Sequence, residues 1–285
     1  MIRPKSFGFN VETAKNNLYQ NRMDLKDEIV QEKALKEFDA FVESLRAKGI
    51  KVDVLEDTRQ PHTPDSIFPN NWFSTHDGKL LIYPMYAENR KLEVGKFLDD
   101  LVELYNPDVI IDLREKFDGV LESTGALVLD RVNKKAYCSL SQRADIELFE
   151  YFCKTLGYRP ISFESYQMGQ KIYHTNVMMS IASRLAFVAT ELIDESMRDE
   201  VLSELREDHE IVELTGDQIL KFCANVLEVR GKDKSYLVMS KTAYAGFLDS
   251  QIELIEQYME IIAVDIDTIE TIGGGSARCM LAEIF

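Results

Sequence analysis

The 285-residue chain lacks several features that mark specialised classes of protein. It has no run of about 18 apolar residues, so we expect no membrane-spanning helix. Its N-terminal segment, MIRPKSFGFNVETAKN, contains no apolar core and does not resemble a secretory signal peptide. There are 33 Lys and Arg against 49 Asp and Glu, and the net charge of −16 argues against nucleic acid or an anionic membrane as a partner.

Cysteine and histidine are also scarce, with four of each in the chain. The cysteines show no paired spacing of the kind that binds a metal, and we expect neither a metal nor a cofactor. Reduced thiols in a cytoplasmic protein are the simplest interpretation. The four cysteines are Cys138, Cys153, Cys223 and Cys279.

The sequence does contain a repeat. After an amphipathic helix predicted over residues 28–48, a unit recurs that consists of a loop, two strands joined by a turn, and an amphipathic helix. The later helices are predicted over residues 90–104, 144–156, 196–206 and 249–259. Equivalent positions in successive units lie 54, 51, 49 and 54 residues apart, which indicates repeated units packed around a common axis. These positions are Asn71, Gly125, Asn176, Asn225 and Cys279.

This repeat predicts an α/β fold with pseudo-fivefold symmetry, in which short mixed sheets lie inside and helices lie outside. We expect residues 1–285 to form a single domain, because no linker rich in Pro, Gly or Ser divides them. Residues 1–27 are polar and are expected to form an arm or lid, with a short strand near Phe7–Phe9. Further strands are expected over residues 51–55 and in the terminal segment SARCMLAEIF, which would form the fifth unit.

The loops that lead into these units carry the candidate catalytic residues, and the fold would bring the loops to one central mouth. Three consecutive glycines precede Cys279, and glycine allows the backbone to approach a ligand closely. Glu122 and His174 lie in the second and third loops. Together the three side chains suit covalent catalysis at a trigonal carbon, in which a thiolate attacks and a histidine transfers protons. Each also has a structural interpretation: a small buried apolar cysteine, a packed histidine and a hydrogen-bonded turn residue.

The motifs in the loops resemble those of the guanidine-modifying, or amidinotransferase, superfamily, which includes arginine deiminase and dimethylarginine dimethylaminohydrolase. The motifs are PDSIFPNN, PNNWFSTH, a His-Thr-Asn and a terminal GGGSxRC. They are most similar to those of arginine-deiminase-related proteins of the citrulline-utilisation hydrolase type. The resemblance extends over residues 60–285 and implies a pentein fold, a five-bladed α/β propeller, in agreement with the repeat.

The resemblance also implies a catalytic role for three residues and a binding role for a fourth. Cys279 corresponds to the nucleophile, His174 to the general acid and base, and Glu122 to the catalytic carboxylate of the superfamily. The segment PDSIFPNN resembles the hydrolases' PDSVFVED, and this similarity aligns Asp65 with a contact to the α-amino group of the substrate.

Other matches concern the two ends of the substrate. Asn70 and Asn71 align with the two acidic residues that hold the guanidinium, and Asn176 stands where arginine deiminase has an aspartate. Arg90 and Arg143 resemble arginines that hold the α-carboxylate, although an arginine that opens a helix is also common as a solvated cap residue.

The amides change the predicted substrate. Superfamily members that act on arginine use aspartates, because a guanidinium is a cation and charge-assisted hydrogen bonds are stronger than neutral ones. An amide can donate to the carbonyl of a neutral ureido group and accept from its NH groups. Asn71 and Asn176 therefore favour citrulline, hydrolysed to ornithine, carbon dioxide and ammonia through a covalent S-linked intermediate. Asp65 and Glu122 are the alternative source of counter-charge for a guanidinium.

The sequence is also compatible with two alternative functions. One is arginine deiminase or dimethylarginine dimethylaminohydrolase activity on a guanidino substrate, and the other is a non-catalytic binding protein of the same fold. Asn225 occupies the equivalent place in the fourth loop, where it either touches the substrate or caps the loop. For an enzyme, the partner is a small amino acid. The sequence does not determine the oligomeric state, for which a homodimer is one option.

Overall fold

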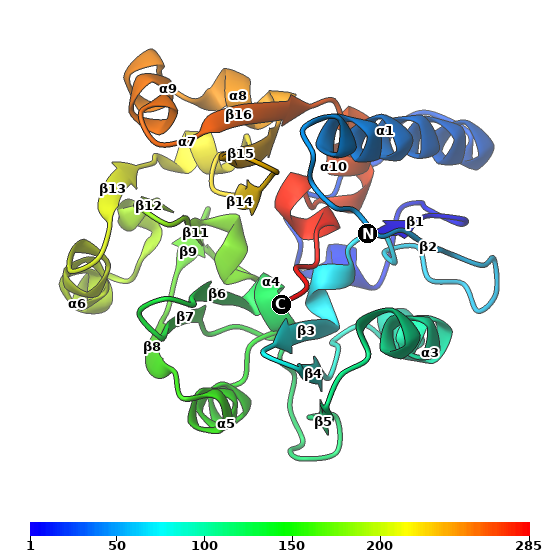
Figure 1. Ribbon diagram of the computed structural model, residues 1–285, viewed down its shortest axis with the longest axis horizontal. Helices are drawn as coiled ribbons and strands as arrows, with labels where there is room; N and C mark the ends of the chain where they lie inside the picture. Colours follow the sequence, from blue (N-terminus) through cyan, green and yellow to red (C-terminus); the bar gives the residue numbers. More distant parts are fainter.

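The computed structural model describes residues 1–285 and consists of small sheets arranged around a central axis, with helices on the outside (Figure 1). Four of the sheets have three strands each, in the orders β3-β4-β5, β6-β7-β8, β11-β12-β13 and β14-β15-β16. The parallel pair β1-β2 lies on the remaining side, and the antiparallel pair β9-β10 is a short hairpin. The five-bladed α/β propeller of the pentein type is confirmed.

The bounds of the strands are β1 Ile2–Arg3, β2 Leu55–Glu56, β3 Phe73–His76, β4 Lys79–Ile82, β5 Val109–Asp112, β6 Leu127–Asp130, β7 Lys135–Ser139, β8 Arg159–Phe163, β9 Tyr166–Gln167, β10 Gln170–Lys171, β11 Met179–Ile181, β12 Leu185–Val188, β13 Glu210–Glu213, β14 Leu227–Arg230, β15 Ser235–Ser240 and β16 Glu260–Val264. The α-helices are α1 Asp27–Ala47, α2 Glu88–Lys91, α3 Glu93–Tyr105, α4 Ser123–Ala126, α5 Ile146–Leu156, α6 Glu195–Arg206, α7 Gly216–Ile219, α8 Lys241–Gly246, α9 Asp249–Glu256 and α10 Asp267–Gly273. The 3₁₀ helices are η1 Thr13–Lys15, η2 Pro69–Asn71, η3 Thr175–Val177, η4 Thr190–Leu192 and η5 Ala277–Met280.

Each complete blade follows the same path. In the first, β3 and β4 form an antiparallel hairpin, α3 then crosses the outside, and β5 returns parallel to β4. The hairpin turns at Asp77 and Gly78, which have φ values of 43° and 79°. A turn with φ > 0 at both central residues matches the twist of the flanking strands, and Asp-Gly is a preferred sequence for it. The third strand of each blade was not predicted from the repeat.

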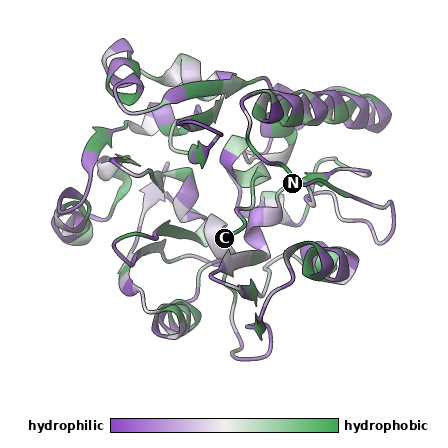
Figure 2. Cartoon of the chain, viewed as in Figure 1, coloured by the Kyte–Doolittle hydropathy of each residue, from purple (hydrophilic) through white to green (hydrophobic).

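The helices cover the blades through apolar faces. Helix α3 buries Val94, Phe97 and Leu101 against β3 and β4, while its opposite side is polar. Figure 2 shows the same division on α1, which is hydrophilic along its outer side. Burial of this kind stabilises the fold by about 25 cal/mol for each Å² of apolar surface removed from water.

The predicted helix before the repeat and the four predicted within it are confirmed to within a few residues as α1, α3, α5, α6 and α9. Helix α3 is preceded by the separate short helix α2. The strand expected near Phe7–Phe9 is wrong, because the arm pairs with the sheet only at β1, and the strand expected over residues 51–55 is reduced to β2.

The terminal strand predicted in SARCMLAEIF is also wrong. Residues 277–280 form η5, and residues 281–285 have no regular secondary structure. The tail is held beside β3 by a side chain instead of a strand ladder: Thr75 Oγ1 donates to the carbonyl of Glu283 at 3.0 Å and accepts from the N–H of Phe285 at 2.9 Å. No helix in the structure is both long enough and apolar enough to cross a membrane.

Candidate active site

The elements that lead into the inner strands meet near the axis, as the repeat predicts. Short helices η2, α4 and η3 precede β3, β6 and β11, and η5 packs against η2. Beside them lies a narrow cavity of about 20 Å³, which has room for about one water molecule. The residues around it are Thr13, Asn17, Asp65, Phe68, Asn71, Arg90, Arg143, Tyr173, His174, Gly273, Gly274, Gly275 and Cys279.

Cys279 lies in η5, directly after the glycine loop, and is 5% exposed. Gly274 ends helix α10 with a φ of 65°, and a Cβ atom there would lie 2.5 Å from the side chain of Gln20 in the arm. Glycine is therefore required both by the left-handed backbone and by the close approach of the arm. The loop closes the cavity on one side and places the thiol against it.

Two amide groups donate to the sulfur of Cys279. Asn176 Nδ2 lies 3.4 Å from Sγ and Asn225 Nδ2 lies 3.2 Å from it, while Asn225 Oδ1 accepts from the backbone N–H of Cys279 at 3.4 Å. The structure therefore brings Asn225 to the thiol itself, where the sequence left open a contact with the substrate or a loop cap.

The other three cysteines are in different surroundings. Burial raises the pKa of Cys138, and it raises the pKa values of Cys153 and Cys223 to about 12. All three pack in hydrophobic clusters away from the cavity. They are inert apolar residues at neutral pH, which leaves Cys279 as the thiol with access to a ligand.

His174 and Glu122 form a buried pair. His174 Nε2 lies 2.7 Å from Glu122 Oε2, and the second carboxylate oxygen accepts from the N–H of Tyr86 at 2.9 Å. Burial lowers the pKa of His174 to about 4, against the opposing effect of Glu122. Burial by itself would raise the pKa of Glu122, but Arg143, at 3.4 Å, and His174 outweigh it and hold the pKa well below its usual value. At neutral pH the pair is a carboxylate and a neutral imidazole.

Gly125 keeps the imidazole close to the Asn71 amide. A Cβ atom at Gly125 would lie 2.8 Å from His174 Cε1 and 2.4 Å from Asn71 Oδ1, and both distances are shorter than van der Waals contact. Only a residue without a side chain allows these two groups to share the space above α4. The glycine at this position, where the other units of the repeat have Asn or Cys, thus has a packing reason.

Asp65 is buried at the arm side of the cavity. Its Oδ2 atom accepts from Asn10 Nδ2 at 2.7 Å and from Thr13 Oγ1 at 3.0 Å, so two residues of the arm are attached to it. Its Oδ1 atom is buried without a hydrogen-bond partner. Burial raises the pKa of Asp65, although Arg90 and Arg143 oppose the effect.

Both predicted arginines line the cavity, and neither is a solvated cap residue. Arg90 is 2% exposed and donates to both oxygens of Glu93, at 2.8 and 3.0 Å, and to the carbonyl of Phe68 at 2.8 Å. Arg143 lies over the ring of Tyr173 at 4.6 Å and donates to Asn16 Oδ1 and to the carbonyl of Thr13 at 3.0 Å. Arg143 therefore joins Glu122 to the arm.

Asn70 differs from the other predicted residues. It is fully buried and neither of its amide atoms has a hydrogen-bond partner, but it does not line the cavity. Its carbonyl accepts from Thr124 Oγ1 at 3.1 Å, so its backbone holds η2 against α4. Asn71, the next residue, does line the cavity.

Four residues of the site were not identified from the sequence. Glu93 follows Arg90 by three residues, a helical spacing at which opposite charges meet, and this signal was available. Thr13, Asn17 and Tyr173 reach the cavity only through the fold of the arm and the glycine loop, and no local pattern marks them. Asn17 Nδ2 donates to the Gly274 carbonyl at 3.3 Å, and Tyr173 Oη donates to the same oxygen at 2.9 Å.

Comparisons with solved structures support the fold. The N-terminal domain of ArgZ bound to product, an arginine dihydrolase from the ornithine-ammonia cycle in Cyanobacteria, superposes with a TM-score of 0.79 and 17% identity over 100% of this chain and 96% of that one. Unliganded AgrE gives 0.80 and 15% over 100% of this chain and 38% of that one. A DDAH mutant from Pseudomonas aeruginosa complexed with citrulline gives 0.66 and 17% over 88% of each chain.

A search of curated protein sequences finds no match. The model of the family described as N,N dimethylarginine dimethylhydrolase, eukaryotic, matches residues 3–285, nearly the whole chain. The expected membership of the guanidine-modifying superfamily is confirmed, as is the expectation of an enzyme that hydrolyses amidine-type C–N bonds. The chain belongs to the eukaryotic N,N dimethylarginine dimethylhydrolase family, and it is a guanidino-group hydrolase.

Proposed function

We propose that the protein hydrolyses the guanidino group of a free arginine derivative, with an Nω-methylated arginine as the first candidate, and that the product is citrulline. This proposal replaces the citrulline substrate favoured by the sequence. It rests on the family match and on the acceptors left free around the cavity.

The observation that carries the proposal is a pair of buried amide oxygens without hydrogen-bond partners, Asn71 Oδ1 and Asn176 Oδ1. Both are acceptors. The donor side of the Asn176 amide is already engaged by Cys279 Sγ and by the Thr124 carbonyl at 3.3 Å. A guanidinium has only N–H donors, whereas a ureido group also carries an acceptor oxygen that needs a donor. These two acceptors therefore favour the guanidinium.

The charges of the site also accommodate a cation. Arg90 is neutralised by Glu93 in a buried pair, and Arg143 faces Glu122. Asp65 then is the acidic residue of the cavity that forms no ion pair. Amides alone would leave a guanidinium without counter-charge, but Asp65 lines the cavity, and Glu122 lies behind His174, which also lines it.

The reaction follows from these residues. The neutral His174 accepts the proton of Cys279, and the amides of Asn176 and Asn225 stabilise the thiolate. The sulfur attacks the guanidino carbon, and the C–N bond to the leaving amine breaks as His174 donates its proton to that amine. A covalent S-alkylthiouronium stays on Cys279. Water then attacks the same carbon and gives a proton to His174, the C–S bond breaks, and the ureido product leaves.

Glu122 supports the proton transfers in this scheme, because its carboxylate stabilises the imidazolium that forms after His174 accepts a proton.

The arm closes the cavity over the substrate. A cavity with room for about one water is too small for an amino acid, so residues 1–27 act as a lid that opens for the substrate. Arg143 and Asp65, both attached to the arm, are placed to bind the α-carboxylate and the α-amino group as the lid closes.

A substrate panel tests the proposal. Purified protein is incubated with asymmetric dimethylarginine, monomethylarginine, arginine and citrulline, and citrulline, ornithine, methylamines and ammonia are quantified. Citrulline formation from a guanidino substrate, abolished in Cys279→Ser but kept in Cys138→Ser, supports the proposal. Turnover of citrulline alone, or undiminished activity of Cys279→Ser, would refute it.

A second candidate is hydrolysis of the ureido group itself, which converts citrulline to ornithine, carbon dioxide and ammonia. The observation that favours it is the amide character of the site: Asn176 and Asn225 donate to the thiol, Asn71 lines the cavity, and Asn71 and Asn176 align with carboxylates of the superfamily members that act on arginine. The same panel separates the candidates, because only this second reaction yields ornithine.

A further inference from the structure

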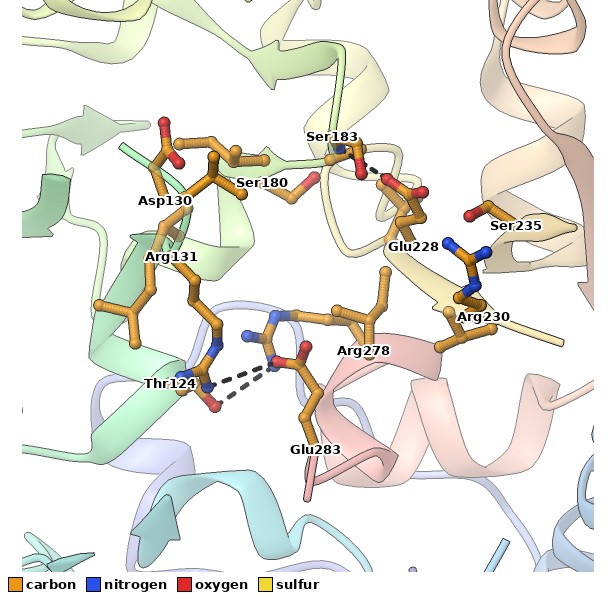
Figure 3. Close-up of a pocket in the computed structure, with 18 of the residues that line it drawn as sticks. Thr124, Asp130, Arg131, Ser180, Ser183, Glu228, Arg230, Ser235, Arg278 and Glu283 are labelled. Atoms are coloured by element: carbon orange, nitrogen blue, oxygen red, sulfur yellow. Dashed lines mark hydrogen bonds and ion pairs between the residues drawn. The ribbon is translucent and has the colours of Figure 1, made fainter. Parts of the chain in front are cut away.

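A second, larger cavity lies on the propeller axis and shares the η5 turn with the first. Cys279 lines the first cavity and its neighbour Arg278 lines the second. The walls come from the inner strands β6, β11 and β14 and from the C-terminal tail (Figure 3). Its volume of about 470 Å³ is within the range of small-molecule sites, about 300–1,000 Å³.

Arg278 is a buried cation without a carboxylate partner. Its side chain is 6% exposed, and its one hydrogen bond is a long contact of 3.4 Å from Nη1 to Thr124 Oγ1. A guanidinium has five N–H donors, so most of its capacity is directed at the cavity. Burial lowers the pKa of Arg278; the nearby Glu283 opposes this effect and Arg131 adds to it. A buried arginine is costly unless an anion or acceptors complete its surroundings.

The carboxylates that line the cavity are engaged elsewhere. Asp130 accepts from His209 Nε2 at 2.8 Å, and Glu228 accepts from the N–H of Ser183 at 2.6 Å. Glu283 lies 3.9 Å from Arg131 Nη2, which makes a loose ion pair (Figure 3). None of them forms an ion pair with Arg278 within 4.0 Å.

Other groups in the cavity suit an anion. Arg230 lines it and forms no ion pair, so a second cation is available near the mouth. Ser180 is 4% exposed, lines the cavity, and its hydroxyl has no hydrogen-bond partner. Ser180 and Arg230 come from different blades, and Figure 3 draws them with Arg278 around the same cavity, Arg278 toward Thr124 and Glu283 and Arg230 beside Ser235. They stand out in a chain whose net charge is −16.

We propose that this axial cavity binds a small anion, with a carboxylate or phosphate group held by Arg278 and completed by Arg230 and Ser180. Guanidinium groups match the paired oxygens of both anion types through bidentate hydrogen bonds. The cavity is separate from the substrate site, and the proposal does not depend on which guanidino compound is hydrolysed.

Isothermal titration calorimetry with inorganic phosphate and with succinate, at matched ionic strength, tests the proposal. Saturable binding of one anion to the wild-type protein is expected, and the anion that binds more tightly identifies the group recognised. Arg278→Gln should weaken the dissociation constant at least tenfold. Arg230→Gln, at an exposed position that leaves folding intact, should weaken it at least threefold, while Arg206→Gln on the outer helix α6 is the matched control.

The titration also distinguishes the two cavities. Binding that disappears in Arg143→Gln and persists in Arg278→Gln would place the anion in the cavity of Cys279 and overturn the proposal. Absence of saturable binding for both anions, or equal binding by Arg230→Gln and Arg206→Gln, would overturn it as well.

Discussion

Replacing Glu122 with Gln tests the proposed role of the buried pair. Gln has nearly the same size and can still accept a hydrogen bond from His174 Nε2, so the imidazole keeps its orientation while the negative charge is lost. In the wild-type protein the carboxylate oxygen lies 2.7 Å from that nitrogen and 3.4 Å from Arg143 Nη1. The substitution therefore removes the negative charge of residue 122 while the hydrogen-bond geometry around His174 is kept.

The size of the effect follows from the contact. Two unit charges about 4 Å apart, roughly the separation of the charge centres here, interact by about 4 kcal/mol at an effective dielectric constant of about 20. This stabilisation exists only when His174 is an imidazolium, which is the state that protonates the leaving amine. Since about 1.36 kcal/mol corresponds to a factor of ten, kcat should fall by about a thousandfold.

Steady-state kinetics with the best substrate of the panel measures the loss. Glu122 raises the pKa of His174 against the effect of burial, so in the variant the pKa should move below its present value of about 4 and shift the corresponding limb of the pH–rate profile to lower pH. Glu204→Gln, at another buried carboxylate far from the cavity, is the control. A kcat for Glu122→Gln above one-tenth of the wild-type value would refute the reasoning.

Three further predictions follow from the geometry. Gly125→Ala places a Cβ atom 2.8 Å from His174 Cε1, and the displaced imidazole should lower kcat about a hundredfold, measured beside unchanged circular dichroism. Burial lowers the pKa of His76 to about 3, so between pH 7 and 5 the unfolded state takes up a proton that the native state does not, and the native state loses stability as the pH falls. In His76→Gln this loss between pH 7 and 5 should be smaller by about 2 kcal/mol, measured by urea unfolding at both pH values. Asn10→Ala removes the 2.7 Å hydrogen bond to Asp65 and should open the arm more often, which would be detected as roughly tenfold faster alkylation of Cys279 by iodoacetamide.

The repeat was enough to predict the architecture because its signals are local. Hairpin turns and amphipathic helices recur at a fixed spacing, and this spacing fixes which loops meet at the axis. For this reason Cys279, His174 and Glu122 can be grouped from the order of residues alone. Their grouping is a topological deduction, supported by the resemblance of their motifs to a known superfamily.

The predictions that differ from the structure concern segments whose conformation depends on side chains far away in the sequence. The tail after Cys279 is apolar enough for a strand, but Thr75 takes up its backbone groups and no ladder forms. The substrate favoured by the sequence differs from the proposed one for a similar reason. The prediction from the sequence assumed that the NH₂ donor and the oxygen acceptor of Asn71 and Asn176 are both available to the substrate. In the structure, the Nδ2 donor of Asn176 is already hydrogen-bonded to the sulfur of Cys279.

The lid role proposed for the arm has a kinetic consequence. Substrate that enters a site with room for about one water must be enclosed before it reacts, and product must wait for the arm to open again. If chemistry is faster than opening, most bound substrate molecules react before they can escape, so the commitment to catalysis is high. Turnover would then slow in proportion to the viscosity of the medium, while isotopic substitution at the scissile C–N bond would leave the observed rate almost unchanged.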